Sequence, residues 1–188
     1  MSELLTDSPI AEQMICVDCG FCCDGTLFSH AHLMPGEKGN LPEKIEEKYE
    51  KIGDNEIFLL PCSYFEGKCT IYNQKRAHIC SAFRCQLLNR LSDGTLSQSQ
   101  AASIVANAFE LRNEIYALFA NIFGHEYGKD FRSMLGELGE IAVESKEKVT
   151  SMKDLEKLKL KCNLFEILLI KNFKSYKDFE SMANTVQS

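Results

Sequence analysis

The stretch 16–23 reads CVDCGFCC and places four cysteines within eight residues. Its first three cysteines follow the spacing Cys-x2-Cys-x2-Cys, which opens a common run of iron–sulfur ligands. A Cys-x2-Cys pair by itself is equally typical of zinc. Because neighbouring side chains diverge, we expect Cys22 and Cys23 to have different destinations: a second metal, a bridging role or a thiol that binds no metal.

A second set of cysteines follows at wider spacing. Its members are Cys62, Cys69, Cys80 and Cys85. We expect a hairpin with its tip at 66–68 to bring Cys62 and Cys69 together. Cys80 and Cys85 are five apart on a helix predicted over 75–91, which does not place them on one face unless the helix breaks. Eight thiolates would fill two tetrahedral zinc sites, or hold one iron–sulfur cluster with four cysteines left for zinc or redox work.

The clustering of these cysteines indicates metal or redox chemistry. Disulfides rarely persist in a reducing compartment, so a disulfide framework is the weaker explanation. A set of buried thiols without metal is also weaker, because the polar-flanked Cys16, Cys19 and Cys22 do not follow a core stripe. The ninth cysteine, Cys162, lies on the apolar stripe of a predicted helix, and we expect it to be a core residue.

The composition limits the classes of protein and partner. The chain has 188 residues, 45% of them hydrophobic and 26% charged, as in a globular protein. A net charge of −6 with scattered Lys and Arg argues against a nucleic-acid partner. The N-terminus does not resemble a signal peptide, and the longest apolar run, 167–170, is too short to cross a bilayer. We expect a cytoplasmic protein without a membrane partner, and another protein stays open as a partner.

The second half of the chain has the apolar periodicity of helices with one buried face. It predicts helices over 99–123, 131–145, 152–173 and 176–183. In the first half, we expect a helix over 41–52 and strands over 56–60 and 69–72. The expected fold is mainly α. An irregular Cys-rich metal-binding module at 1–98, with a short β-hairpin, packs against a C-terminal helical bundle at 99–188 within one compact domain.

These motifs resemble the YkgJ-type cysteine-cluster family, which is described as a zinc- or iron-chelating domain. The family pattern is a CxxCxxCC run, a Pro-Cys pair, a Cys followed by Ile-Tyr, an Arg-Pro pair and two closing cysteines around an aromatic residue. The chain matches it over roughly 16–88, with the run 16–23, Pro61-Cys62, Cys69-Thr70-Ile71-Tyr72, Arg76, Cys80, Phe83 and Cys85. Two residues depart from the pattern: Ala77 and Arg84 stand where the family has proline.

The resemblance implies metal chelation by the cysteines but no settled reaction. The expected ligands are Cys16, Cys19, Cys22, Cys23, Cys62, Cys69, Cys80 and Cys85. The triple spacing favours iron, as an iron–sulfur cluster, over zinc. A similar cluster occurs in flagellin lysine N-methylases, so a redox or methyl-transfer-related enzyme is one alternative. A structural zinc module that mediates protein–protein contact is another, and whether the protein is an enzyme stays open.

Several further side chains lie within or near the motifs. His30, His32 and His78 carry imidazoles that bind zinc or iron, but eight thiolates leave them without a necessary role. Arg76 falls between two cysteines of the second set, where it is placed to donate hydrogen bonds to thiolates and offset their charge. No catalytic residue stands out from the sequence.

Overall fold

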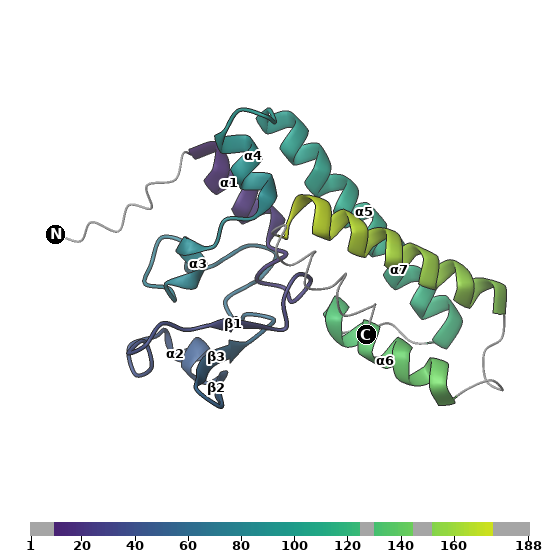
Figure 1. Cartoon of the computed structure of the whole chain (residues 1–188), viewed down its shortest axis with the longest axis horizontal. Coiled ribbons are helices and arrows are strands. Elements are labelled where there is room, and N and C mark those ends of the chain that lie inside the picture. Colours follow the sequence, from purple (N-terminus) through teal and green to yellow (C-terminus); the bar gives the residue numbers. More distant parts are fainter. Residues whose placement is uncertain (1–9, 125–129, 145–151, 175–188) are drawn as a thin grey trace. The chain divides into compact units, whose positions relative to one another are not determined.

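A computed structural model describes residues 10–124, 130–144 and 152–174 (Figure 1). The fold is mainly helical, as the sequence predicted, and it contains a small three-stranded antiparallel sheet where the sequence predicted a hairpin. The chain divides into two compact units, the first formed by Met1–Arg84 with Leu88–Thr95 and the second by Cys85–Leu87 with Leu96–Ser188. Within the described ranges, none of the helices combines the length and the apolar character that crossing a bilayer requires.

The first unit contains short helices around the sheet. In chain order its elements are α1 (Ile10–Cys19), β1 (His30–His32), α2 (Glu43–Glu46), β2 (Tyr49–Ile52), β3 (Asn55–Leu59) and α3 (Ile79–Ala82). Strand β3 lies in the middle of the sheet and pairs with β1 on one side and β2 on the other. A hydrophobic core cluster packs on this sheet, formed by Leu33, Ile45, Phe58, Ile71 and Ala77.

The predicted strand over 56–60 is confirmed by β3, but the predicted helix over 41–52 is wrong. Only the four residues of α2 are helical, and the chain then forms β2. The reason is the turn after Ile52: Gly53 has φ +60 and opens a two-residue loop that pairs Ile52 with Asn55. A glycine with positive φ at this position is typical of a tight hairpin, which fixes the preceding residues as a strand.

Two other expectations differ from the structure in part. The return strand over 69–72 does not form, because only an isolated bridge joins Phe65 to Cys69 before the chain turns again. The helix over 75–91 breaks into α3 and α4 (Gln86–Ser92). The break occurs at Phe83, which is extended with φ −72 and ψ 126.

The second unit confirms three of the predicted helices. They are α5 (Gln98–Phe123), α6 (Phe131–Glu144) and α7 (Met152–Asn172), and the helix predicted over 176–183 lies outside the described residues. Helices α5 and α7 pack along each other (Figure 1). The fully buried Phe131 and Phe165 meet edge to face with ring centroids 4.8 Å apart. Packing of apolar stripes therefore organises this half of the chain.

Candidate metal centre

Helix α1 carries the first two cysteines of the run. The helix runs through Cys16 and ends at Cys19. Residues three apart on a helix are neighbours on its surface, so Cys16 and Cys19 lie on one side of the last turn. Gly20 then ends the helix with φ +61, and its N–H donates to the Cys16 carbonyl at 3.2 Å.

The residues after α1 lie directly on the loop that carries Cys62 and Cys69. The Cys62 N–H donates to the Cys23 carbonyl with an N···O distance of 2.7 Å. Gly20 approaches the Phe65 ring so closely that a Cβ built on it would lie 2.2 Å from Phe65 Cε2. Since Phe65 also bridges to Cys69, these contacts hold the two cysteine sets together through the backbone.

The second set of cysteines shares one packing environment. Cys62, Cys69 and Cys80 are half-buried and all pack against the hydrophobic core cluster of the first unit. Ala77 belongs to this cluster and is fully buried, and its carbonyl accepts the Cys80 N–H at 3.0 Å. The core therefore fixes the positions of three sulfur-bearing residues that lie up to 18 residues apart in the chain.

The pKa of Cys23 reports which other thiols lie within electrostatic range of its side chain. Burial, and then four neighbouring thiols, raise the pKa of Cys23 well above its ordinary value. The four thiols, in order of their effect, are those of Cys80, Cys62, Cys16 and Cys69. Five thiols from three chain segments thus lie within electrostatic range of a common centre, the Cys23 side chain.

The same forces act on Cys80 and Cys62. Burial, followed by the Cys62 thiol, raises the pKa of Cys80 to about 12, and the Arg76 guanidinium opposes this increase. The pKa of Cys62 is also raised, chiefly by burial. These thiols are therefore protonated near neutral pH in the metal-free protein, and a metal would have to displace their protons.

Two of the five thiols line a small cavity inside the first unit. The cavity has a volume of about 20 Å³, and its lining includes Cys16, Cys80, Glu12, Arg84, Tyr72 and Arg76. Arg84 donates to Glu12 Oε2, while Glu12 Oε1 has no hydrogen-bond partner among the described residues although the side chain is only 2% exposed. The Arg76 guanidinium lies 4.3 Å from the centroid of the Tyr72 ring. Arg76 is thus placed beside the thiols, as expected for a residue that offsets their charge.

Sequence reasoning missed Glu12 and Arg84 as residues of this site. In the sequence, Arg84 stands out only as a departure from the family pattern, and Glu12 belongs to no motif. One signal was present: Glu12 precedes Cys16 by four residues, so a helix that extends through both places them on the same face. This signal is useful only if the helix is predicted to extend through Cys16, as α1 does.

Three further cysteines are among the predicted ligands. Cys19 is buried at the end of α1, Cys22 is half-buried in the turn that follows, and Cys85 opens the second unit. The alternative imidazole ligands are exposed, with His30 and His32 together on β1 at a ring-centroid distance of 5.3 Å. His78 is also exposed, and its backbone N–H donates to Glu37.

No three or more His, Cys, Asp or Glu side chains among the described residues are arranged to hold a metal ion as they stand. Sulfurs bound to one tetrahedral zinc lie about 4 Å apart, because each Zn–S bond is about 2.3 Å long. Metal binding would therefore require cysteine side chains to turn toward a common point. The donor chemistry fits thiophilic metals, since thiolates favour zinc and iron–sulfur clusters.

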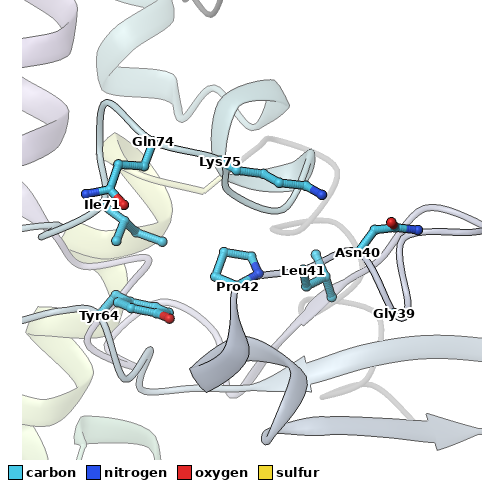
Figure 2. Close-up of a pocket in the computed structure, with 8 residues that line it drawn as sticks. All are labelled: Gly39, Asn40, Leu41, Pro42, Tyr64, Ile71, Gln74 and Lys75. Carbon is cyan, nitrogen blue, oxygen red and sulfur yellow. The ribbon is translucent and has the colours of Figure 1, made fainter.

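A larger surface hollow of about 400 Å³ lies in the same unit. Figure 2 shows Pro42 near its centre, between Tyr64 and Leu41, with Ile71, Gln74 and Lys75 above it. Tyr64 packs against the core cluster, and its hydroxyl accepts the Lys44 N–H at 3.4 Å. Tyr64 thus has a packing role in the hollow. The smaller cavity, which two cysteines line, is the better candidate for a functional site.

Cys162 is confirmed as a core residue of the second unit, with only 4% of its surface exposed. Burial, followed by the nearby Glu166, raises the pKa of Cys162 from 9.0 to about 11. Its thiol therefore stabilises the folded state fully below pH 9, and this contribution is lost as the pH rises through 11.

We expect the free energy of unfolding to fall more between pH 9 and pH 11 for the wild type than for Cys162→Ala. The physical reason is that the unfolded chain releases the Cys162 proton in this range while the folded chain retains it. Urea unfolding of both proteins across the range measures the difference. An equal loss in the two proteins would contradict the assigned burial effect.

Comparisons of the chain with models of known families, with curated proteins and with solved structures find no match. The chemistry of the site therefore rests on its own residues.

Proposed function

We propose that this protein binds a metal through its cysteine thiolates, either iron as an iron–sulfur cluster or zinc. The ligands come from Cys16, Cys19, Cys22, Cys23, Cys62, Cys69, Cys80 and Cys85. The observation that carries the proposal is the convergence of the run 16–23, the loop 62–69 and helix α3 around Cys23. The resemblance to the YkgJ-type cysteine-cluster proteins supports the same function.

The way in which the segments meet favours metal binding over simple thiol burial. A buried cysteine needs only apolar neighbours, which any part of a core can supply. Here the segments meet through specific backbone contacts, the Cys62–Cys23 hydrogen bond and the close approach of Gly20 to Phe65. Such contacts fix the positions of the sulfurs, which is what a coordination site requires.

The charges around the thiols are also suitable for a centre with thiolate ligands. Deprotonated cysteines in a partly buried site need positive charge, from the metal and from residues around it. Arg76 already lowers the pKa of Cys80, against the effect of burial. When bound, the metal would supply the larger part of this charge and would hold the three segments together.

Anaerobic purification followed by elemental analysis and visible absorption tests the proposal. Iron with labile sulfide and a broad visible absorption would support a cluster, and one or two equivalents of zinc without colour would support tetrahedral zinc sites. A chelator should also lower the melting temperature, because metal that binds the folded chain stabilises it. Metal well below one equivalent, with no uptake on anaerobic reconstitution, would refute the proposal.

The chemistry of clustered thiols also indicates the compartment in which the protein would work. The reducing cytoplasm keeps clustered thiols from forming disulfides, so it is the setting in which this centre would assemble. The protein is expected to work without nucleic acid or a membrane as partner. Redox or methyl-transfer chemistry would require an open coordination position, and a closed four-thiolate zinc site would indicate a structural role.

Contact with another protein is a second candidate function, favoured by one observation. Helix α7 exposes Leu160, Leu164 and Ile167 at fractions of 59%, 49% and 60%. Residues at these intervals lie on one side of a helix, so they form an apolar stripe. Native mass spectrometry of the full chain, alone and with Leu164→Glu, tests whether the stripe mediates association.

A further inference from the structure

We infer that Cys23 and Cys62 form a reversible disulfide, which makes metal binding by this protein sensitive to oxidation. The disulfide is argued from the fold alone, and its effect on the metal rests on the proposed function. The starting point is the backbone hydrogen bond in which the Cys62 N–H donates to the Cys23 carbonyl.

This hydrogen bond limits the distance between the two α carbons. Its N···O distance is 2.7 Å, and with standard backbone bond lengths it keeps the Cα atoms of Cys23 and Cys62 at most about 6.6 Å apart. Cα atoms joined by a disulfide are usually about 4.4–6.8 Å apart. The two segments therefore do not have to approach each other for the bond to form.

The two side chains are suitably placed as well. After burial, the thiols of Cys80 and then Cys62 have the largest effects in raising the pKa of Cys23, so the Cys62 thiol lies within electrostatic range of it. Neither Cys23 nor Cys62 is in a disulfide in the structure. Both are half-buried, so small reagents in the solvent have access to them.

The fold, rather than the sequence spacing, selects this pair. Cys62 packs against the hydrophobic core cluster, and its carbonyl accepts the Phe65 N–H at 3.0 Å. The Phe65 ring in turn lies against Gly20, three residues before Cys23. In the unfolded chain the cysteines of the run 16–23 are much closer to one another than to Cys62. Pairing of Cys23 with Cys62 therefore depends on the folded first unit.

The reaction is a two-electron oxidation by a small-molecule disulfide such as oxidised glutathione. One of the two cysteines, as its thiolate, attacks the oxidant and forms a mixed disulfide, which releases the first glutathione. The other cysteine then attacks the protein sulfur of the mixed disulfide and releases the second glutathione. The S–S bond of the oxidant is thus replaced by the Cys23–Cys62 bond, and both thiol protons end on glutathione. Excess reduced glutathione reverses the two steps.

The disulfide and the metal compete for the same sulfurs. The thiolate is the form of cysteine that binds metals, and a sulfur within a disulfide is no longer a thiolate. Oxidation therefore removes two of the proposed ligands, one from the run 16–23 and one from the loop 62–69. A bound metal, in turn, should protect the two thiols from the oxidant.

Peptide mapping of the metal-free chain after oxidation with oxidised glutathione and alkylation tests the disulfide. Trypsin cleaves after Lys51 and Lys68, so Cys62 is the single cysteine of peptide 52–68, while peptide 1–38 carries the run. We expect these two peptides to be joined in the wild type and in Cys22→Ser, the matched control at the neighbouring position. In Cys23→Ser the joined pair should be lost. Fragmentation of the joined wild-type peptides locates the bonded cysteine directly, so the result does not depend on how well the variants fold.

Peptides that stay separate in the wild type, or a bond to a cysteine other than Cys23, would overturn the disulfide. For protein loaded with Zn²⁺, we expect oxidation to release the metal to a coloured zinc indicator and excess reduced glutathione to restore binding. Zinc retained after the disulfide has formed would overturn its control of metal binding. Protein that takes up neither zinc nor iron would refute the proposed function and this control together, whereas the peptides decide the disulfide independently.

Discussion

Cys23→Ser is expected to produce a folded protein that loses its bound metal. The Cys23 thiol lies within electrostatic range of the thiols of Cys16, Cys62, Cys69 and Cys80, so its loss removes one donor from this group. Serine retains the Cys23 carbonyl that accepts the Cys62 N–H, which preserves the backbone contact between the two cysteine sets. We expect the metal affinity to fall by more than about 100-fold, beyond the effect of losing a residue that only supports a ligand.

Elemental analysis and competition with a chelator of known affinity measure this loss. Cys162→Ser is the matched control, because it removes a sulfur that is buried in the core of the second unit. This control should lose stability but retain the metal content of the wild type. Equal metal content and equal affinity in Cys23→Ser and the wild type would show that the centre, if present, does not involve Cys23.

Gly20→Ala is expected to destabilise the first unit by about 2–5 kcal/mol. A left-handed backbone costs an alanine about 1–2 kcal/mol, and Gly20 has φ +61. The new methyl group would also lie 2.2 Å from Phe65 Cε2, and overpacking of this kind costs about 1–3 kcal/mol. The added strain falls on the contact that joins the cysteine run to the loop 62–69, so metal affinity should fall together with stability.

Three further variants, Gly53→Ala, Phe65→Ala and Gly20→Ala/Phe65→Ala, separate the causes of this effect. Gly53→Ala has nearly the same backbone angle, φ +60, with nothing within 4 Å of the added Cβ, so it should show only the backbone cost. In Gly20→Ala/Phe65→Ala the steric conflict is absent, so the two substitutions should be less destabilising together than the sum of their separate effects. Urea unfolding of the wild type, Gly20→Ala, Phe65→Ala and the double variant gives the coupling energy. Simple additivity would show that Gly20 and Phe65 do not meet in this way.

The helices of the second unit could be predicted from the sequence because local signals there agree with the packing. Ser97 and Gln100 form a capping box at the start of α5, and Gly124 ends the helix with φ 75. The apolar stripes of α5 and α7 are long, and long periodic segments leave little choice of structure. Cys162 could be assigned to the core for the same reason.

The strands of the first unit were harder to predict because they are short and their pairing is not local. Ile45, Tyr49 and Ile52 have a spacing that also fits one face of a helix, and Ile45 is indeed buried in α2. The overlooked signal was the pair Gly53-Asp54 between two short segments, which is typical of a hairpin turn. Register with β3 then overrides the weak helical pattern.

The candidate site was predictable in its residue types but not in its arrangement. Spacing indicated which cysteines to consider, since a dense run of cysteines has few structural explanations. It did not indicate which thiols from the second set lie near Cys23, because that depends on the turn after Gly20. The Glu12–Arg84 pair joins residues 72 positions apart, and such a contact arises only from tertiary structure.

The five thiols of this group differ in how far solvent reaches them. Cys16 faces the solvent, whereas Cys23, Cys62, Cys69 and Cys80 are half-buried. Oxidants, alkylating agents and the thiols of other molecules therefore meet Cys16 first. We therefore expect substitutions in the last turn of α1, which carries Cys16, to alter the rate at which these thiols react with such molecules.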